Sequence, residues 1–393
     1  MTTTAVGMIE IVERIGREVA RPDAARVDKL GVFPSPALDA LRAAGVFGAG
    51  VPAEFGGGGA DVDELLSMCV TLARHCASSA MILAMHHIQV VSIARHLGGA
   101  PELEAYLRRV VVERRLIASV TSEVGPAGDM RRSIAAVRRT GERFEVTKRA
   151  TTISYGAHAD DLLLTARRDA DSAPGDQVAV LLLRPDFEIR EPGVWDTLGM
   201  RGTCSGGGVV TGSGSAWQIL RVPFGVVASE TMVPVSHILW AGCWLGIASD
   251  AVDRARTTVR AKARKDPDEA QAAATELSDV EARLQAMRDV VRSASLEFER
   301  LADDRAALSS ISFGLRMNHL KLIASEAVVD VVTSALRICG ISAYANDPRT
   351  SLGRHLRDAH SAALMVNNRR LRSTNASLLL VHKADAPDHP GRS

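Results

Sequence analysis

The sequence is poor in cysteine and has no excess of charge of either sign. Forty-seven Lys and Arg residues stand against 46 Asp and Glu residues, which leaves a formal net charge of +1. Nothing in that balance favours a nucleic acid or an anionic membrane as a partner. The cysteines are odd in number and widely spaced, so they indicate neither a disulfide framework nor a zinc site, and we expect each to be a small core residue: Cys69, Cys76, Cys204, Cys243 and Cys339.

Long apolar runs are also missing. The N-terminal stretch "MTTTAVGMIEIVERIGREVA" has no apolar core of signal-peptide length behind a basic start. The longest runs, such as "VAVLLL", are far shorter than the roughly 20 residues that a membrane span needs. The sequence therefore predicts a cytoplasmic protein in a reducing setting, with no membrane partner and no metal.

The first third of the 393 residues has helical patterns. "SPALDALRAAGVFG" carries a candidate N-cap at Ser35 and apolar residues at helical spacing, before the glycine-rich "EFGGGGAD" breaks the pattern. The following segment, "DVDELLSMCVTLARHCASSAMILAMHHIQVVSIARHLGG", is apolar on most faces, which indicates buried helices in a multi-layer arrangement.

The pattern then changes to strands and back to helices. A turn at Gly141 separates short alternating runs, and "DQVAVLLLRPDFEIR" and "SGGGVVTGSGSAWQILRVP" also have strand character. Long amphipathic helical segments follow to near the C-terminus. This order predicts an α+β fold with segregated layers: an N-terminal α-helical domain (1–118), a middle β domain (119–228), a C-terminal four-helix-bundle domain (229–383) and a disordered tail (384–393).

Several motifs, in order along the chain, resemble the acyl-CoA dehydrogenase family. "ASVTSEVGPAGD" is similar to that family's Thr-Glu-Pro-x-Ala-Gly-Ser-Asp loop, "TISYGAHAD" to its Trp-Ile-Thr-Asn-Gly strand, and "LGMRGTCS" to its Leu-Gly-x-Arg-Gly-Thr turn. "RICGISAY" and "LRDAHSAALMVNN" stand where the Gln-x-x-Gly-Gly and Tyr-Glu-Gly-Thr segments belong. Their common order and spacing carry the resemblance over almost the whole chain.

The resemblance implies a substrate, a cofactor and an assembly. Members of the family oxidise an acyl thioester: a carboxylate removes the α proton while the β hydrogen passes as hydride to FAD. We therefore expect FAD, an acyl thioester of CoA or of a carrier protein, and a homodimer or homotetramer, or a hetero-oligomer with a paralogue.

Two serines are carried over to the flavin ring by the resemblance. Ser122 takes the place of the threonine that hydrogen-bonds the flavin pyrimidine edge, and Ser154 that of the threonine whose hydroxyl or amide faces flavin N5. Thr152 replaces the tryptophan that packs beside the ring, so a large aromatic wall is lost.

Five further positions are carried over to the rest of FAD. Arg260 matches the pyrophosphate arginine, whose planar fork suits a diphosphate, and Gln271 matches the following glutamine. Arg337 and Gly340 stand in the turn that reaches the adenosine half, largely across a subunit interface. Asn368 replaces a threonine of the Tyr-Glu-Gly-Thr segment and is able to hydrogen-bond in its place.

The catalytic carboxylate is where the sequence departs most from the family. Val366 occupies the position of the glutamate and cannot accept a proton, although its backbone N–H remains able to polarise a carbonyl. Ser236 occupies the alternative position that some members use. His237, the next residue, is a candidate base.

Other histidines and one acid are alternatives for that base. His86 and His87 are candidates because they lie on a helix that lines the site in the family. His360 is a candidate because it lies just before Val366. Glu123 belongs to the flavin loop and is a poor candidate. For each histidine a structural role stands beside the catalytic one.

Four functions remain open on the sequence. The first is an FAD-dependent acyl-thioester dehydrogenase with a non-standard or absent base, and it ranks slightly above the others. The second is a flavin-dependent monooxygenase on the same fold. The third is a non-catalytic subunit of a heteromeric dehydrogenase, and the fourth is a flavoprotein that catalyses a non-oxidative elimination or cyclisation of a thioester.

Overall fold

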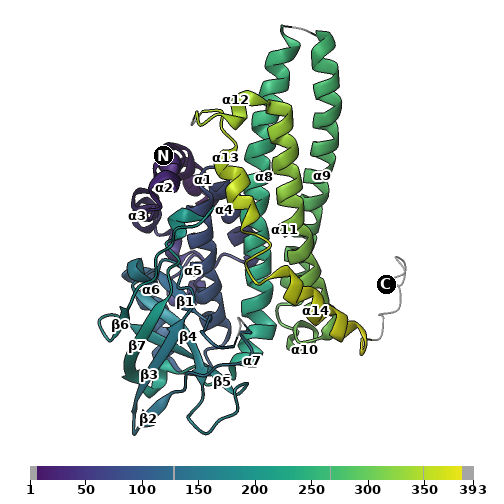
Figure 1. The fold of residues 1–393 in the computed structure, drawn as a ribbon. Helices are drawn as coiled ribbons and strands as arrows, with labels where there is room; N and C mark the ends of the chain where they lie inside the picture. The colour runs from purple at the N-terminus through teal and green to yellow at the C-terminus, as the bar shows by residue number, and fades with distance from the viewer. Residues whose placement is uncertain (1–6, 127–128, 266, 348, 383–393) are drawn as a thin grey trace, which may run out of the picture.

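The N-terminal part of the chain is a group of helices that surrounds α4 and α5 (Figure 1). The computed structural model describes residues 7–126, 129–265, 267–347 and 349–382. A π-helical segment, Gly16–Ala20, joins α1 to α2. The helices are α1 (Met8–Ile15), α2 (Arg21–Leu30), α3 (Ser35–Ala43), α4 (Val62–Ala73), α5 (Ala77–Arg95) and α6 (Pro101–Val112), with short 3-10 turns at Val46–Gly48 and Ala53–Phe55.

Local chemistry explains where two of these helices begin. α4 starts at a capping box, in which the Glu64 N–H donates to Asp61 and the Asp61 N–H donates to Glu64. Ser35 is not the N-cap that the sequence suggested. The Pro34 carbonyl already accepts from the Leu38 N–H, so Pro34 is the N-cap, and Ser35 is the first residue of α3 without a capping side-chain bond.

Two sheets form the middle part of the chain and lie together at one end of the molecule (Figure 1). The strands of the first sheet lie in the order β1 (Ile117–Val120), β4 (Asp161–Arg167), β5 (Gln177–Leu183), with β1 parallel to β4 and β4 antiparallel to β5. The second sheet is antiparallel in the order β2 (Arg138–Thr140), β3 (Arg143–Ala150), β7 (Gly208–Ser215), β6 (Phe187–Arg190). β3 alternates buried and exposed residues after the predicted turn at Gly141, where φ is +58°. β4 and β5 are buried along almost their whole length, because elements cover both faces of that sheet.

Three long helices, α8, α9 and α11, and several short ones make up the C-terminal part. They are α7 (Phe224–Val227), α8 (Val233–Ala263), α9 (Pro267–Arg300), α10 (Arg305–Leu308), α11 (Ile311–Cys339), α12 (Ile341–Tyr344), α13 (Gly353–His360) and α14 (Asn368–Leu379), with a π-helical segment, Ala228–Met232, before α8. The tips of α8 and α9 project beyond the rest of the molecule (Figure 1).

Two glycines allow α8 to lie very close to α4. A Cβ atom at Gly242 would lie 2.4 Å from Cδ1 of Leu66, and one at Gly246 would lie 2.5 Å from the carbonyl oxygen of Val70. The later glycine of α8 meets the later residue of α4, so α4 and α8 run in the same direction. The N-terminal and C-terminal helices therefore share one core around α8.

Two helical stretches, Ala77–Arg95 and Phe224–Ala263, are long and apolar enough to cross a membrane by length and composition alone. The apolar window of each is 89% buried inside the molecule. Both are therefore accounted for as core helices of the fold. The sequence had indicated no segment of that length, because histidine, serine and glycine interrupt the apolar runs.

The predicted domain limits fall inside elements of the structure. The limit at 118 divides β1, and the limit at 228 falls at the first residue of the π-helical segment before α8. The predicted tail, 384–393, lies outside the described residues.

Candidate active site

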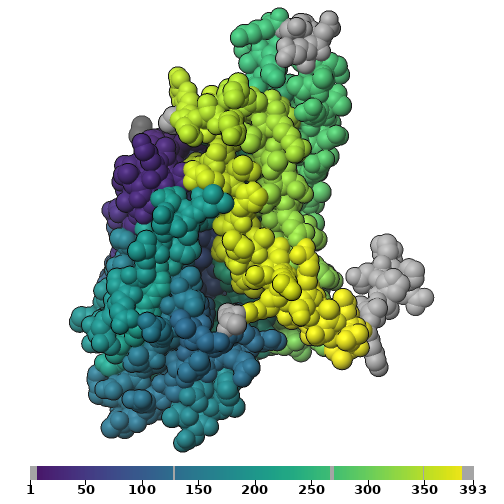
Figure 2. Space-filling view, in the orientation of Figure 1, coloured from purple at the N-terminus to yellow at the C-terminus, as the bar shows by residue number. Residues whose placement is uncertain are grey.

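A cavity of ≈ 1430 Å³ lies between the β sheets and the C-terminal helices. Its wall is formed by parts of α5, the ends of β1 and β3, the segment 195–205, the start of α8, the start of α11 and the segment 357–378. In Figure 2 the yellow C-terminal segment runs beside the teal and blue β strands, and the surface between them is hollowed. Segments far apart in the sequence thus meet at one site.

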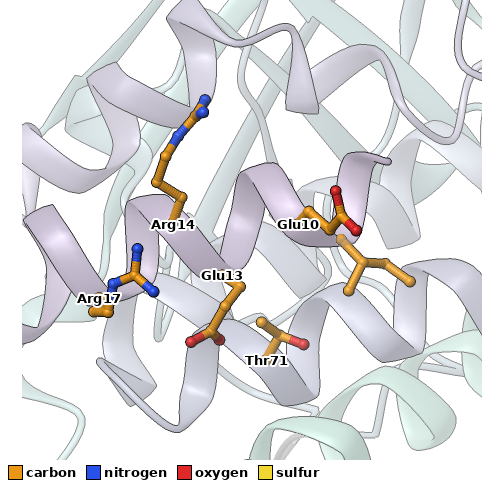
Figure 3. Close-up of a pocket in the computed structure, with 6 residues that line it drawn as sticks. Glu10, Glu13, Arg14, Arg17 and Thr71 are labelled. Carbon is orange, nitrogen blue, oxygen red and sulfur yellow. The ribbon is translucent and has the colours of Figure 1, made fainter. Parts of the chain in front are cut away.

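A second hollow, of ≈ 420 Å³, lies on α1 and α4 (Figure 3). It is lined by Ile9, Glu10, Glu13, Arg14, Arg17 and Thr71. Glu13 is hydrogen-bonded to His75 at 3.0 Å and Arg17 is paired with Glu18 at 2.9 Å. This hollow contains none of the residues predicted from the sequence.

Ser122 and Ser154 both line the large cavity. The Ser122 hydroxyl donates to the Thr152 carbonyl at 2.8 Å and accepts from the Thr152 N–H at 3.1 Å. The Ser154 hydroxyl oxygen accepts from the Ser205 hydroxyl at 2.8 Å. Hydroxyl groups and backbone from three segments therefore form one polar wall of the cavity.

Both positions of the family carboxylate lie on the cavity wall and neither bears an acid. Val366 lies in the loop between α13 and α14, and its carbonyl oxygen accepts from Lys321 Nζ at 3.0 Å. The Ser236 hydroxyl donates to the Met232 carbonyl at 2.5 Å. Among the described residues that line the cavity, Asp129 is the one acid, and it is paired with Arg131 at 3.0 Å.

His237 is a buried residue on the cavity wall with a defined tautomer. Its Nδ1 lies 3.0 Å from the Met317 carbonyl oxygen. Because a carbonyl oxygen only accepts, Nδ1 carries the proton and Nε2 carries the lone pair. Burial lowers the pKa of His237 to about 4, and the positive charge of Lys321 acts in the same direction. The ring is therefore neutral at pH 7.

The other three candidate histidines differ from His237. His86 uses both ring nitrogens inside the fold, one with the Phe47 carbonyl at 2.8 Å and the other accepting from the Ile117 N–H at 3.1 Å, so its role is structural. His87 is buried with no hydrogen-bond partner among the described residues, and it is not on the cavity wall. His360 is on the wall and is exposed. Glu123 is held by the Ser133 hydroxyl and the backbone N–H groups of 134 and 135.

The residues predicted to hold the rest of FAD do not line the cavity within one chain. Arg260, Gln271, Arg337 and Gly340 lie toward the end of the C-terminal bundle where the Thr258 hydroxyl meets Cys339 at 3.6 Å. Arg260, Gln271 and Arg337 are exposed there. Asn368 is buried behind the wall, where its amide donates to the Ser325 hydroxyl at 3.0 Å and accepts from Lys321. A hydrogen bond from Asn368 to a flavin in the cavity thus competes with these contacts.

Sequence reasoning missed Lys321, which is fully buried beside Val366 and His237. Lysine in a helix is usually assigned to the solvent face. The signal was present, because Lys321 shares the helical face of Met317, Ala324 and Val328, all of which are buried.

The fold and the cavity together define an acyl-CoA dehydrogenase-like flavoprotein, and comparison with known proteins agrees. The family description "Acyl-CoA dehydrogenase, N-terminal domain" matches residues 4–113, and "Acyl-CoA dehydrogenase, C-terminal domain" matches residues 238–368. The chain belongs to the acyl-CoA dehydrogenase family.

Individual relatives differ in the reactions that their names describe. The chain is 27% identical to the amino sugar nitrososynthase DnmZ of Streptomyces peucetius over 86% of this chain and 84% of that protein. It is 25% identical to the cyclohex-1-ene-1-carbonyl-CoA dehydrogenase of Geobacter metallireducens over 87% of this chain and 88% of that protein. Among solved structures, FMN-bound TdsC of Paenibacillus sp. A11-2, a dibenzothiophene monooxygenase, superposes with a TM-score of 0.81 at 20% identity over 97% of this chain and 99% of that one.

The residues of the cavity fit a flavin. The ring system of a flavin has one polar edge and two apolar faces, and the cavity has a polar wall at Ser122 and Ser154 and apolar side chains from α5, α8 and α11, such as Met85, Trp240 and Met317. Its volume exceeds the roughly 300–1,000 Å³ usual for a pocket that holds one small ligand. A flavin and a substrate therefore fit together.

Proposed function

We propose that this chain is a flavin-dependent monooxygenase built on the acyl-CoA dehydrogenase fold. The observation that carries the proposal is the cavity wall, where valine and serine occupy both carboxylate positions of the family and Asp129 is paired with Arg131. Removal of an α proton from a thioester needs a base in contact with that carbon. The wall offers a neutral imidazole, His237, in place of a carboxylate.

The names of two relatives support this choice. One is a nitrososynthase for an amino sugar, and the other is a monooxygenase for the sulfur compound dibenzothiophene. When bound, a reduced flavin supplies two electrons to dioxygen, so that one oxygen atom enters the substrate and the other leaves as water. The residues of this chain do the rest: Ser122 and Ser154 border the flavin edge, Met85 and Trp240 exclude bulk water, and His237 Nε2 accepts a hydrogen bond from the substrate.

The decisive experiment follows the oxygen atoms. Flavin-loaded protein is reduced without air and mixed with ¹⁸O₂ and a panel of amine, hydroxyl and thioether compounds. Mass spectrometry should find one ¹⁸O in a product, and hydrogen peroxide should fall by the same amount. Peroxide release that no compound diminishes, together with rapid anaerobic flavin bleaching by acyl-CoA esters, would overturn the proposal.

An acyl-thioester dehydrogenase is the second candidate, and one observation favours it. Val366 lines the cavity, and its N–H has no acceptor among the described residues, so the amide donor that polarises a thioester carbonyl is retained. The CoA dehydrogenases among the relatives support the same reading. Its substrate would be an acyl thioester of CoA or of a carrier protein, and its test is the anaerobic bleaching described for the variants of Val366 below.

We further propose FAD as the flavin, in a cytoplasmic homodimer or homotetramer or a hetero-oligomer with a paralogue. Arg260, Gln271, Arg337 and Gly340 share the exposed end of the bundle, away from the cavity wall of their own chain. A second copy would have to bring them to the adenosine half of FAD. The TdsC structure contains FMN, so FMN in place of FAD is the alternative outcome.

A further inference from the structure

Lys321 is a buried cation without a buried anion. Its side chain is fully buried in α11, and its ammonium group donates to the Val366 carbonyl at 3.0 Å and to the side-chain oxygen of Asn368 at 2.5 Å. Both acceptors are neutral. The nearest acid that acts on it, Glu326, is exposed and bonded to Arg372. A charge held in this way acts on its surroundings with little screening.

His237 lies within reach of that charge. The Met317 carbonyl, which fixes the His237 tautomer, is one helical turn before Lys321 on α11. Lys321 is the one charged group that acts on the imidazole, and no acid on α8, α11 or α14 opposes it there among the described residues. Burial opposes protonation of His237, and the charge of Lys321 opposes it further, so Nε2 stays a hydrogen-bond acceptor.

The wall around His237 is largely apolar. The Trp240 ring lies 6.2 Å from the imidazole, and methionines 85, 232 and 317 share the cavity wall. The Ser236 hydroxyl is already committed to the Met232 carbonyl. The polar groups that the wall offers without a partner among the described residues are the lone pair of His237 Nε2, the Gln89 side-chain oxygen and the Trp240 Nε1–H. Of these, His237 Nε2 and the Gln89 oxygen accept a hydrogen bond, and both therefore suit a substrate group that donates one.

We propose that this part of the cavity binds the reacting end of the substrate as an uncharged amine or hydroxyl, which donates to His237 Nε2, and that Lys321 excludes the ammonium form. An N–H or O–H group satisfies the lone pair, whereas an ammonium group would meet the positive charge of Lys321 with no carboxylate to offset it. The inference rests on the proposed function, since an amine with a free lone pair is the form that accepts an oxygen atom. Lys321 is a positioning residue here, because it acts through His237 and the 366 loop.

The first experiment measures the protonation of His237 directly. Protein labelled with ¹⁵N-histidine is titrated by NMR, and the His237 signals are assigned by their loss in His237→Gln. We expect the Nδ1–H tautomer, and we expect Lys321→Met to raise the pKa of His237, while burial, the larger cause, keeps that pKa below its usual value. Lys321→Gln removes the charge but keeps a hydrogen-bond donor for the Val366 carbonyl. It therefore tests the charge alone, and it should also raise the pKa of His237. Lys29→Met, which removes an exposed lysine at the end of α2, should leave it unchanged.

The second experiment uses two probes of the same shape, cyclohexanol and cyclohexylamine, followed by the change in flavin absorbance on binding. At pH 7.5 the amine is an ammonium ion, and we expect cyclohexanol to bind at least tenfold more tightly. The affinity for cyclohexylamine should rise with pH for two reasons. The amine loses its proton, with a pKa near 10.4 for a lysine-like amine, and Lys321 loses its charge at a lower pH, because burial lowers the pKa of Lys321 to about 8. Lys321→Gln should reduce this discrimination.

The outcomes separate this inference from the function on which it rests. Equal binding of the two probes at pH 7.5, or a pKa of His237 that both Lys321 variants leave unchanged, overturns it. Neither measurement involves oxygen, so preserved discrimination without ¹⁸O incorporation would reject the monooxygenase and keep the site. Incorporation of ¹⁸O without discrimination between the two probes would keep the monooxygenase and reject the proposed binding site.

Discussion

At the scale of the residue, Val366 is unusual in its backbone as well as in its side chain. Its φ is +43°, a left-handed conformation that a β-branched residue rarely adopts. Such a residue costs about 1–3 kcal/mol and persists only where its surroundings hold it. Here the hydrogen bond from Lys321 and the packing of the loop hold it.

Replacing Val366 by glutamate tests whether the lost base is what separates this chain from the dehydrogenases. If FAD and an acyl chain bind as in the family, Val366→Glu should speed anaerobic flavin bleaching by acyl-CoA esters by about 10²- to 10⁴-fold, the usual value of general-base catalysis. Burial raises the pKa of a carboxyl group, so this activity should rise with pH as the new side chain ionises.

Val366→Gln is the control for that change, because it has the same size without a base. Stopped-flow absorbance with a series of acyl-CoA chain lengths gives the rates. Rapid bleaching by the unmodified protein would show that another residue already acts as the base, and His237→Ala would then identify it. No bleaching by any variant would leave the monooxygenase as the stronger candidate.

At the scale of the element, Asp250 on α8 joins three helices. Its carboxylate accepts from Arg21 on α2 at 2.8 Å, from Arg254 on α8 at 2.8 Å, and is hydrogen-bonded to His355 on α13 at 2.8 Å. These partners hold the pKa of Asp250 far below its usual value, against the effect of burial. α13 precedes the loop that carries Val366, so this joint also fixes the cavity wall.

We expect Asp250→Ala to lower the free energy of unfolding by about 3–5 kcal/mol, because it leaves buried partners without their anion. Asp253→Ala is a matched control one turn away on α8: its carboxylate pairs with Arg74 and Arg256 but is about one-third exposed, so its removal should change stability by about 0–1 kcal/mol. Urea titration followed by circular dichroism measures both. Equal losses in the two variants would contradict the role given to the joint.

The elements were largely predictable from periodicity, and the exceptions have physical reasons. The helices of the first and last thirds and the turn at Gly141 follow from apolar spacing and a glycine with positive φ. The N-cap at Ser35 was wrong because a proline carbonyl one residue earlier begins the helix. Lys321 was missed because only the tertiary structure shows that its helical face is covered by the segment around Val366 and Asn368.

The site was predictable where a motif fixes a position and not where assembly decides it. Val366, His237, Ser122 and Ser154 were found by their places in the motifs, and all four line one cavity. His86 and His87 share a helix with cavity residues, yet their side chains point elsewhere, because neighbouring residues on a helix lie on different faces. The roles of all these residues remain predictions.

At the scale of the whole molecule, buried histidines make stability depend on pH. Burial lowers the pKa values of His86, His96, His237 and His355 to about 4. The unfolded chain takes up these protons near pH 6.5, whereas the folded chain does not until about pH 4. These histidines should therefore not lower the free energy of unfolding above pH 6.5. As the pH drops from 6.5 toward 4, each should lower it by at most about 1.4 kcal/mol per pH unit.

His87 offers the sharpest single test of this dependence. Burial lowers its pKa well below the usual value, and its ring has no hydrogen bond to lose among the described residues. His87→Leu should reduce the slope of the free energy of unfolding against pH between pH 6.5 and 4, by up to about 1.4 kcal/mol per pH unit, the value for one proton. His319→Leu, at an exposed position, serves as the control. Urea midpoints across this range give the slopes, and an unchanged slope in His87→Leu would contradict the assignment.

Assembly and flavin type form the last whole-molecule prediction. We expect Arg260→Ala to lower flavin retention and light scattering to find a dimer or tetramer, because Arg260 does not line the cavity of its own chain and the proposed FAD site takes it from another copy. Chromatography of the released cofactor distinguishes FAD from FMN. A flavin-loaded monomer at micromolar concentration, or equal flavin content in the variant, would remove Arg260 from the site.

One wall of the cavity comes from a single stretch of sequence, from α13 to the end of α14. Near α13 it is bonded to the body by His355 to Asp250, Arg357 to Asp28, and Asp358 to the Met200 N–H. Further along, Lys321 on α11 donates to the Val366 carbonyl and to Asn368. The stretch is continuous in sequence, so one exchange moves it as a unit if the replacement keeps the groups that bind Asp28, Asp250, the Met200 N–H and Lys321. A recombination event near residue 353 could replace the Val366 loop and both flanking helices at once and leave the polar wall at Ser122 and Ser154 untouched. Within this family, a change of reaction would then be within the reach of one crossover instead of many separate substitutions.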